Sequence, residues 1–245
     1  VFGSSGAIGN QTAECLKKSK HNLILTSRKN NSFNQNLSKK LSSPFFSFDF
    51  EKSLNYKSLE KKIRKITPRL QGLIVSIAKP FPNKFIHNTD ETIFEEQLNI
   101  HLLSLHKIIR SSLPFLEASK KNCTPRITYI STEYLIGSPP IKIAPYLAAK
   151  SAATTYVKVL AKELIIKGIK VFIICPGMIK SKLTSNIPEE YFKQIEKKLP
   201  EKQLTNCKDI SSIIDAIYKG YLDSSYGNEI QVSKTILLSP KSEFT

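Results

Sequence analysis

Hydrophobic positions along the chain follow two different periods. Short runs rich in β-branched or aromatic residues are typical of buried strands, and the longer stretches between them repeat their apolar positions as helices do. The predicted strands are NLILTS, PFFSFDF, LIVSIA, RITYIS, KVFIIC and NEIQV. Strands that alternate with helices pair in parallel, because each crossover returns the chain to the same end of the sheet. The pattern predicts an α/β fold, a doubly wound parallel sheet with helices on both faces, in one domain spanning residues 1–245.

One predicted helix, Ala144–Leu164, has two apolar faces. The stripe expected to pack on the sheet comprises Ala149, Ala153, Tyr156, Leu160 and Leu164. A second stripe of mostly small residues, about 100° away around the helix, comprises Ala148, Ala152, Thr155 and Val159. Small residues let another helix approach closely, so the second stripe is either a contact surface for a partner subunit or a face covered by the protein's own chain.

Three glycines, Gly3, Gly6 and Gly9, lie between the strand end Val1–Phe2 and the helix-like stretch QTAECLKK. Glycine tolerates positive φ and lets the backbone approach a pyrophosphate, whose charge the helix N-terminus stabilises. A glycine-rich turn without a ligand is the alternative, but the first strand–turn–helix connection is where doubly wound folds bind dinucleotides. The residues assigned to the cofactor from this turn are Gly3, Ser5, Gly6, Ile8 and Gly9.

The end of the next strand favours NADP(H) over NAD(H). Folds of this kind that bind NAD usually place Asp or Glu there to hold the ribose 2′-hydroxyl, whereas LILTSRKN supplies Ser27 and Arg28. Arg28 can pair with a 2′-phosphate while Ser27 donates a hydrogen bond to it; the alternative is an ordinary surface arginine. Asp49, at the end of the following strand, is expected to accept a hydrogen bond from the adenine amino group, or else to cap the helix that begins near Leu54.

Tyr146 and Lys150 stand four residues apart, on one face of the predicted helix. A phenol is a poor acid or base at neutral pH, but a neighbouring ammonium stabilises the phenolate and lowers the pKa. Upstream, the strand RITYIST ends with two hydroxyl side chains, Ser131 and Thr132, either of which can hold a substrate carbonyl oxygen. Together these residues predict proton transfer to or from an oxygen.

In this order the motifs resemble those of the short-chain dehydrogenases/reductases, and the resemblance covers essentially the whole chain. It implies a three-layer Rossmann-like sheet of about seven strands and a catalytic set that falls on Asn99, Ser131, Tyr146 and Lys150. In the implied reaction a hydride moves between the nicotinamide and a substrate carbon while Tyr146 exchanges a proton with the substrate oxygen. Lys150 would tune the phenol and bind the nicotinamide ribose, Ser131 would orient the substrate, and Asn99 would hold a water that passes protons to Lys150.

The resemblance also implies further cofactor contacts. Pro176 and Gly177, in IICPGMI, match the family's Pro-Gly beside the nicotinamide, and Ala78 falls within the family's Asn-Asn-Ala-Gly stretch. That stretch is Ser-Ile-Ala-Lys in this chain, so Lys79 stands where the family has glycine. This departure keeps a second interpretation open, in which the protein is a catalytically inactive relative that binds the cofactor as a sensor or scaffold.

Substrate and assembly are predicted only coarsely. A lid is expected at about residues 178–206, over a small carbonyl or alcohol substrate, and its lysines favour an anionic one: Lys180, Lys182, Lys193 and Lys197. In the family the helix that contains Tyr146 and the one that contains Asn99 pair with their copies in a partner subunit. We therefore expect a homodimer or homotetramer.

Composition changes this picture little. The formal charge of +17 would suggest nucleic acid as a partner, but only five of the 37 basic residues are arginine and the lysines never run longer than two together. We expect a solvated lysine-rich surface that binds neither nucleic acid nor membrane. The four cysteines are far apart, which predicts no metal site and a reducing compartment, the cytoplasm. The chain begins at Val1, within a strand-like run, as if an upstream piece were missing.

Overall fold

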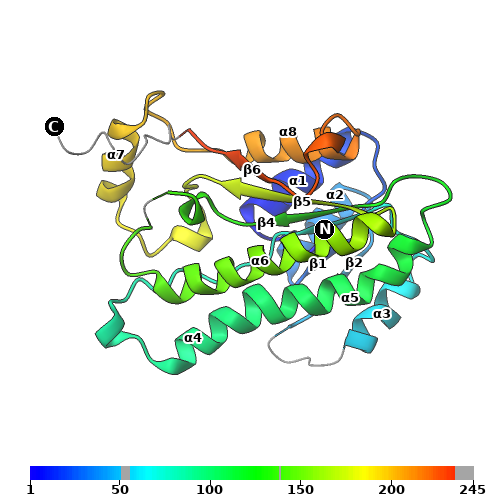
Figure 1. The fold of residues 1–245 in the computed structure, drawn as a ribbon, viewed down its shortest axis with the longest axis horizontal. Helices are drawn as coiled ribbons and strands as arrows, with labels where there is room; N and C mark the ends of the chain where they lie inside the picture. The colour runs from blue at the N-terminus through cyan, green and yellow to red at the C-terminus, as the bar shows by residue number, and fades with distance from the viewer. Residues whose placement is uncertain (51–55, 138, 235–245) are drawn as a thin grey trace.

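The computed structural model describes residues 1–50, 56–137 and 139–234; the predicted domain range of 1–245 and the helix start near Leu54 extend outside these residues. Within them the strands are all paired in parallel (Figure 1). They are β1 (Leu25–Ser27), β2 (Phe45–Ser47), β3 (Gly72–Val75), β4 (Arg126–Ile130), β5 (Lys170–Pro176) and β6 (Glu229–Val232). Phe2 bridges Thr26 of β1 and Val75 of β3, so the spatial order is β2–β1–Phe2–β3–β4–β5–β6. The predicted doubly wound parallel sheet is confirmed, but the described residues form six strands and the Phe2 bridge where about seven strands were predicted.

Helices cover both faces of this sheet, as predicted. They are α1 (Ala7–Lys18), α2 (Ser32–Lys40), α3 (Tyr56–Arg64), α4 (Glu91–Leu98), α5 (Ser104–Glu117), α6 (Ala144–Ile166), α7 (Glu189–Lys198) and α8 (Cys207–Tyr218). One hydrophobic cluster joins the sheet to α3, α5 and α6, and a second joins it to α1, α2 and α8. The central strands are buried on both sides, which explains why their sequences read as continuous apolar runs.

The long helix α6 buries one of its two apolar stripes. Ala149, Ala153 and Leu164 are buried within the chain, whereas the small-residue stripe lies mainly at the surface and Val159 is 50 % exposed. The exposed stripe is where the expected partner helix would pack, and the oligomer stays a prediction.

A widened turn separates α4 from α5. Residues Asn99–Leu103 form a π-helical turn, in which Asn99 accepts a hydrogen bond from the Ser104 hydroxyl through its backbone oxygen. Such turns add a residue to a helix and rotate the side chains that precede them. The turn exposes the Asn99 side chain and buries that of His101.

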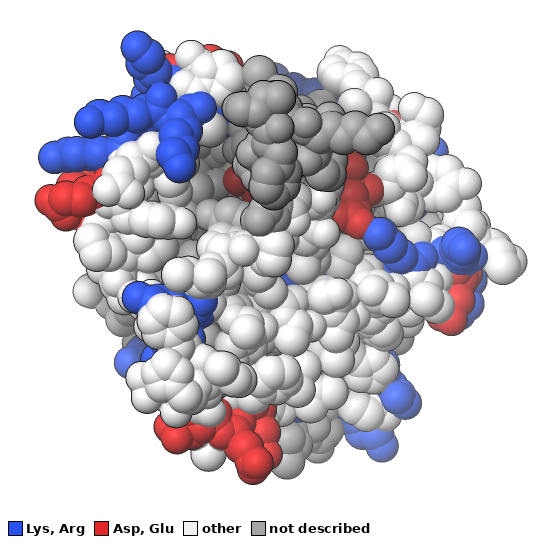
Figure 2. Space-filling model, turned by 60° about the vertical axis from the view of Figure 1, so that its left-hand side comes forward, with Lys and Arg blue, Asp and Glu red and all other residues white. Residues whose placement is uncertain are grey.

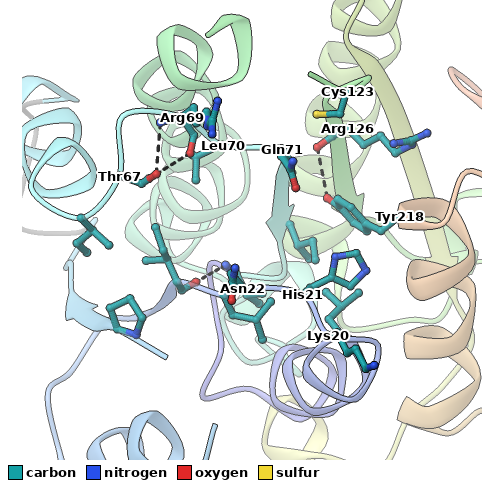
Figure 3. Close-up of a pocket in the computed structure, with 18 of the residues that line it drawn as sticks. Lys20, His21, Asn22, Thr67, Arg69, Leu70, Gln71, Cys123, Arg126 and Tyr218 are labelled. Atoms are coloured by element: carbon teal, nitrogen blue, oxygen red, sulfur yellow. Dashed lines mark hydrogen bonds between the residues drawn. The ribbon is translucent and has the colours of Figure 1, made fainter. Parts of the chain in front are cut away.

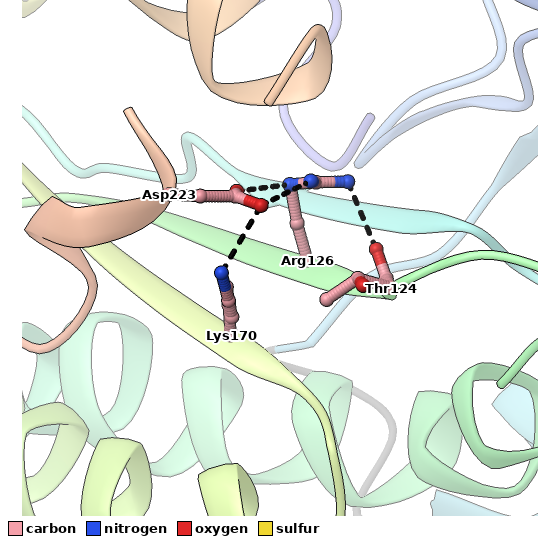
Figure 4. A network of polar contacts seen from close by, with 4 residues as sticks. All are labelled: Thr124, Arg126, Lys170 and Asp223. Carbon is pink, nitrogen blue, oxygen red and sulfur yellow. Dashed lines mark hydrogen bonds and ion pairs between the residues drawn. The ribbon is translucent and has the colours of Figure 1, made fainter. Parts of the chain in front are cut away.

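The amino ends of β4 and β5 are held by charged side chains. Arg126 donates two hydrogen bonds to the Asp223 carboxylate, at 3.0 and 2.9 Å, and Lys170 pairs with the same carboxylate at 3.0 Å (Figure 4). Arg126 also donates to the backbone oxygen of Thr124. Burial raises the pKa of Asp223, but the hydrogen bonds from Lys170 and Arg126 outweigh it and hold the pKa below its ordinary value. The network ties two strands to the turn before β6.

The same edge of the sheet contains a cavity of about 700 Å³ (Figure 3). His21, Asn22, Arg69, Gln71 and Tyr218 are among the side chains around it. Ligands of doubly wound folds bind at the opposite edge, where the strands end and the helix N-termini point. The functional residues are therefore expected at the carboxyl edge.

Candidate active site

A cavity of about 230 Å³, here called the tyrosine cavity, opens at the carboxyl ends of the central strands. Its walls combine the start of α1, the loops after β3, β4 and β5, and the first turns of α6. The predicted residues among its lining are Gly6, Ile8, Ala78, Ser131, Tyr146, Lys150, Pro176 and Gly177. Motifs up to 171 residues apart in the chain, from Gly6 to Gly177, thus meet at one place.

The glycine turn has the close backbone packing that a dinucleotide site requires. Gly3 has φ +85°, and a Cβ on it would lie 2.4 Å from the backbone oxygen of Ser76. A Cβ on Gly9 would lie 2.2 Å from the backbone oxygen of Gly3, so only glycine lets α1 pack this closely on the turn. Gly6 is the N-cap of α1, whose first amides face the turn. The residues present fit a pyrophosphate at the helix N-terminus.

A second cavity of about 310 Å³, the glycine-turn cavity, continues from the first. Its walls include Gly3, Ser5, Arg28 and Lys79, and the last of these pairs with Glu96 at 2.8 Å. Phe48 and Phe50 also line it, whereas Asp49, between them in the chain, is not among the described residues of its wall. An adenine ring in this cavity would therefore meet aromatic side chains.

The Ser27 hydroxyl makes two hydrogen bonds within the protein, which the sequence did not predict. Its hydroxyl donates to the backbone oxygen of Lys29 at 3.0 Å and accepts a hydrogen bond from the side-chain amide of Asn34 at 2.7 Å. Asn34 also donates to the oxygen of Lys29, so it fixes the turn that presents Arg28. Sequence reasoning missed this role of Asn34.

Tyr146 is almost completely buried at the wall of the tyrosine cavity. It is 3 % exposed, and its ring contacts Phe81 and His101 edge-on, with centroids 4.6 and 5.1 Å away. Burial raises the pKa of Tyr146 above its ordinary value, and a hydrogen bond with the Thr132 side chain opposes part of that rise. The phenol is therefore neutral at physiological pH and carries a proton that it can donate.

Lys150 is buried one turn further along α6. Its Nζ donates to the backbone oxygen of Ile130 at 2.6 Å and lies 4.9 Å from the centre of the Tyr129 ring. Burial lowers the pKa of Lys150 to about 7, and Cys175 opposes the change slightly. The amine can thus gain or lose a proton near neutral pH.

The two hydroxyls that end β4 have different neighbours. Ser131 Oγ lies 2.6 Å from Thr154 Oγ1, beneath α6, because it follows Tyr129 on the same face of the strand. Thr132 interacts with the Tyr146 side chain and accepts a hydrogen bond from the backbone amide of Tyr134. Both residues line the cavity, but Thr132 is the one whose side chain acts on the pKa of Tyr146.

Of the predicted catalytic residues, the structure brings Ser131, Tyr146 and Lys150 to one cavity and does not bring Asn99 there. His101, which the sequence reasoning did not single out, is 1 % exposed, contacts the Tyr146 ring and is close enough to Lys150 for the lysine charge to lower its pKa further after burial has done so. A signal for it existed: the buried stripe of α5 includes Leu105, and four residues before Leu105 is His101.

The expected lid segment lies beside both the tyrosine cavity and an apolar cavity of about 370 Å³. The apolar cavity is lined by Phe81, Asn83, Tyr134, Pro140, Ile141, Lys142, Ile143, Met178, Ile187, Pro188 and Tyr191. Of the lid lysines, Lys180 pairs with Glu189 of α7 at 2.6 Å and Lys182 borders the tyrosine cavity. The space next to Tyr146 is therefore mainly hydrophobic.

Figure 2 brings forward the side of the molecule where α7 and the first turns of α6 lie. Most of the surface shown is uncharged, and the Lys and Arg side chains gather toward its edges. Across the described residues, no helix is both long and apolar enough to cross a membrane.

Comparison with known proteins agrees with this architecture. A family model described as enoyl-(acyl carrier protein) reductase matches residues 3–232. An uncharacterised oxidoreductase of Bacillus subtilis, YmfI, is 25 % identical over 214 residues, which is 86 % of each chain. The Pseudomonas aeruginosa RhlG/NADP active-site complex is 20 % identical with a TM-score of 0.88, over 97 % of this chain and 95 % of that one.

A further structure, the 3-oxoacyl-[acyl-carrier protein] reductase of Brucella melitensis in complex with NAD, is 19 % identical with a TM-score of 0.84, over 96 % of this chain and 94 % of that one. These two structural likenesses confirm the predicted fold, and the family-model match spans nearly all of the described chain. The chain belongs to the short-chain dehydrogenase/reductase family of oxidoreductases.

Proposed function

We propose that the protein is an NADP(H)-dependent oxidoreductase that reduces a carbonyl to an alcohol, or catalyses the reverse reaction, with Tyr146 as proton donor and acceptor. The observation that carries the proposal is the position of the Tyr146 phenol. It is buried, interacts with Thr132 and lies at the wall of a cavity that also contains the N-terminus of α1 and Lys150.

Each side chain of the tyrosine cavity has its own role in the proposed reaction. A bound nicotinamide cofactor supplies or accepts the hydride. Tyr146, a neutral phenol, donates its proton to the substrate oxygen as negative charge develops there. Thr132 accepts or donates a hydrogen bond at that oxygen and at the phenol, while Ser131 supports the strand end through Thr154. Lys150, with a pKa of about 7, returns a proton toward the phenolate.

The preference for NADP(H) rests on Arg28. This side chain is exposed at the rim of the glycine-turn cavity, where no Asp or Glu is found among the described residues of the wall. A guanidinium there attracts a 2′-phosphate, whereas a carboxylate would repel it. Since the Ser27 hydroxyl already has two partners, Arg28 is the main contact in this proposal. Complexes of similar proteins contain NADP in one case and NAD in another, so they do not favour either cofactor.

The substrate proposed is a carbonyl compound with an apolar portion next to the reacting carbon. The apolar cavity beside Tyr146 would bury that portion under Ile187 and Tyr191. An anionic group further from the carbonyl would lie near Lys182, at the border of the tyrosine cavity. The homodimer or homotetramer and the cytoplasmic location stay predictions.

The second candidate is a relative that binds the cofactor without turnover. Lys79 supports it, because a long charged side chain stands in the wall of the glycine-turn cavity where the family has glycine. Steady oxidation of NADPH with any carbonyl compound would exclude this candidate.

The proposal is tested by Tyr146→Phe, which removes only the hydroxyl and keeps the ring against Phe81 and His101. We expect an unchanged circular dichroism spectrum, NADPH affinity within about twofold of wild type, and kcat lowered by at least about 10², the lower range for loss of a positioned proton donor. Tyr221→Phe, which removes the hydroxyl of a tyrosine that is 78 % exposed and lines neither the tyrosine cavity nor the apolar cavity, is the matched control. Full activity of Tyr146→Phe on a carbonyl that the wild type reduces would refute the mechanism.

A further inference from the structure

Lys79 is a charged side chain in the wall of the glycine-turn cavity, at a position where the family has glycine. It lies in the loop after β3, and this loop runs along the glycine turn, since the backbone amide of Ser76 donates to the backbone oxygen of Phe2 at 2.9 Å. The Lys79 Nζ lies 2.8 Å from the carboxylate of Glu96 on α4, and the lysine side chain is 26 % exposed. Most of the side chain is therefore buried beside the cavity, with its charge next to a carboxylate.

The glycine-turn cavity is positively charged. Among the described residues that line it, the charged side chains are Arg28 and Lys79. The first turn of α1 contains no charged residue, and its N-cap Gly6 has no side chain to accept hydrogen bonds from the first amides. A dinucleotide brings the negative charge of its pyrophosphate to this helix end, where the helix dipole supplies only about +0.5 of an elementary charge. With Arg28 assigned to the 2′-phosphate, Lys79 is the other cation of the cavity wall.

The ion pair with Glu96 does not by itself explain why Lys79 lies in this wall. Ion pairs at the protein surface add little stability, because water screens the charges and two long side chains must be ordered. The Glu96 side chain is 55 % exposed, so water can hydrate its carboxylate when the lysine leaves. A hydrogen bond from an ammonium group to a phosphate oxygen is stronger than an exposed ion pair. A phosphate group in the cavity therefore competes successfully with Glu96 for the lysine.

We propose that Lys79 is a cofactor-binding residue of this chain, whose ammonium group leaves Glu96 and donates a hydrogen bond to the pyrophosphate when a nicotinamide dinucleotide binds. The inference rests on the proposed function for the identity of the ligand. NADPH and NADH share the pyrophosphate, so Lys79 strengthens the binding of both, whereas Arg28 distinguishes them by the 2′-phosphate. Glu96 competes with the cofactor for Lys79 and so weakens cofactor binding.

The first experiment measures binding by titration calorimetry in the absence of substrate. We expect Lys79→Met to bind NADPH, NADH and ADP about tenfold more weakly than wild type, since one hydrogen bond to a charged group is worth about that much. The ratio of the NADPH and NADH affinities should not change. Lys84→Met is the matched control, because Lys84 is an exposed lysine of the same loop that lines neither the glycine-turn cavity nor the tyrosine cavity. It removes the same charge and should leave all three affinities within about twofold of wild type.

Glu96 provides a second experiment, because its replacement should have the opposite effect. Glu96→Gln removes the competing carboxylate, so we expect all three ligands to bind about two- to fivefold more tightly, in keeping with the strength of an exposed ion pair. In a Lys79→Met background the same substitution should not change the affinities, because the lysine on which it acts is absent. Glu95→Gln, which removes an exposed carboxylate from the same helix, is the control for a general change in charge and should bind as wild type does.

Two results would overturn the inference. One is an unchanged affinity of Lys79→Met for ADP, and the other is a loss confined to NADPH, which would assign Lys79 to the 2′-phosphate instead. Failure of the proposed function gives a different result. In that case Tyr146→Phe keeps full turnover, while the loss of ADP affinity in Lys79→Met still supports the role of the lysine.

Discussion

Replacing Lys150 by Met should stabilise the ligand-free protein, and the size of the effect should depend on pH. Burial lowers the pKa of Lys150 from 10.5 to about 7, and one pKa unit corresponds to about 1.4 kcal/mol. At pH 7 the unfolded chain carries a fully charged lysine and the folded site is about half charged, so the lysine costs about 4 kcal/mol. At pH 9 the same calculation gives about 2 kcal/mol.

The sign follows from proton binding. Between the folded and the unfolded pKa the unfolded state binds more protons, so wild-type stability rises as the pH increases from 7 toward 10.5. Met fills the space with an unbranched apolar chain but loses the hydrogen bond from Lys150 to Ile130, worth about 2 kcal/mol. We expect the variant to be more stable by about 2 kcal/mol at pH 7 and nearly equal to wild type at pH 9, since the two effects oppose each other.

The assay is urea unfolding at 25 °C followed by circular dichroism, without cofactor, at pH 7 and pH 9. Lys162→Met is the matched control, because Lys162 is exposed on the same helix. The lost hydrogen bond has the same effect on stability at both pH values. The change in the stability difference between variant and wild type from pH 7 to pH 9 therefore depends only on the protonation of Lys150. A difference that stays constant between the two pH values would show that the folded Lys150 remains charged, and the reasoning would be wrong.

Three further outcomes are expected. Arg28→Ala should reduce the preference for NADPH over NADH by roughly tenfold, the effect of one charged hydrogen bond, as measured by fluorescence titration with each cofactor; equal affinities in the wild type would contradict the assignment. Asp223→Ala should lower the free energy of unfolding by about 2 kcal/mol in urea, because it leaves the half-buried Arg126 without its carboxylate, and should leave NADPH affinity unchanged. Thr132→Val should lower kcat more than Ser131→Ala does, because Thr132 is the hydroxyl joined to Tyr146; the opposite order would assign the role to Ser131.

The fold was predictable because its signals are periodic. The strand runs were located correctly, although β1 covers only Leu25–Ser27 of the run NLILTS and β2 only Phe45–Ser47 of the run PFFSFDF. The helix predicted over Ala144–Leu164 is present as α6. Long apolar patterns average over many residues, so they tolerate errors at single positions.

The site was predictable only in part, because local backbone geometry determines which side chains reach the cavity. The spacing of Tyr146 and Lys150 belongs to a regular helix, and it places both at the cavity. The position of Asn99 depends on a π-helical turn that helix periodicity does not predict, although the helical spacing of His101 and Leu105 does indicate that His101 is buried. Strand alternation does separate Ser131 from Thr132, since Ser131 shares a face with Tyr129, but where the strand ends is visible only in three dimensions.

The burial of three ionisable side chains in one place bears on whether the protein is an enzyme or a scaffold. Tyr146, Lys150 and His101 are each at most 3 % exposed. Burial makes the charged forms of Lys150 and His101 less favourable than they would be in water. A protein that only binds a cofactor gains nothing from the phenol or the imidazole, and drift toward apolar residues would make its fold more stable. Lys79 lines the glycine-turn cavity and not the tyrosine cavity, so any effect it has would be on cofactor binding and not on the proton of Tyr146. The protein keeps ionisable side chains that make its fold less stable, and this favours catalysis over a scaffold role. We therefore expect the Lys150→Met variant to be more stable than wild type and inactive.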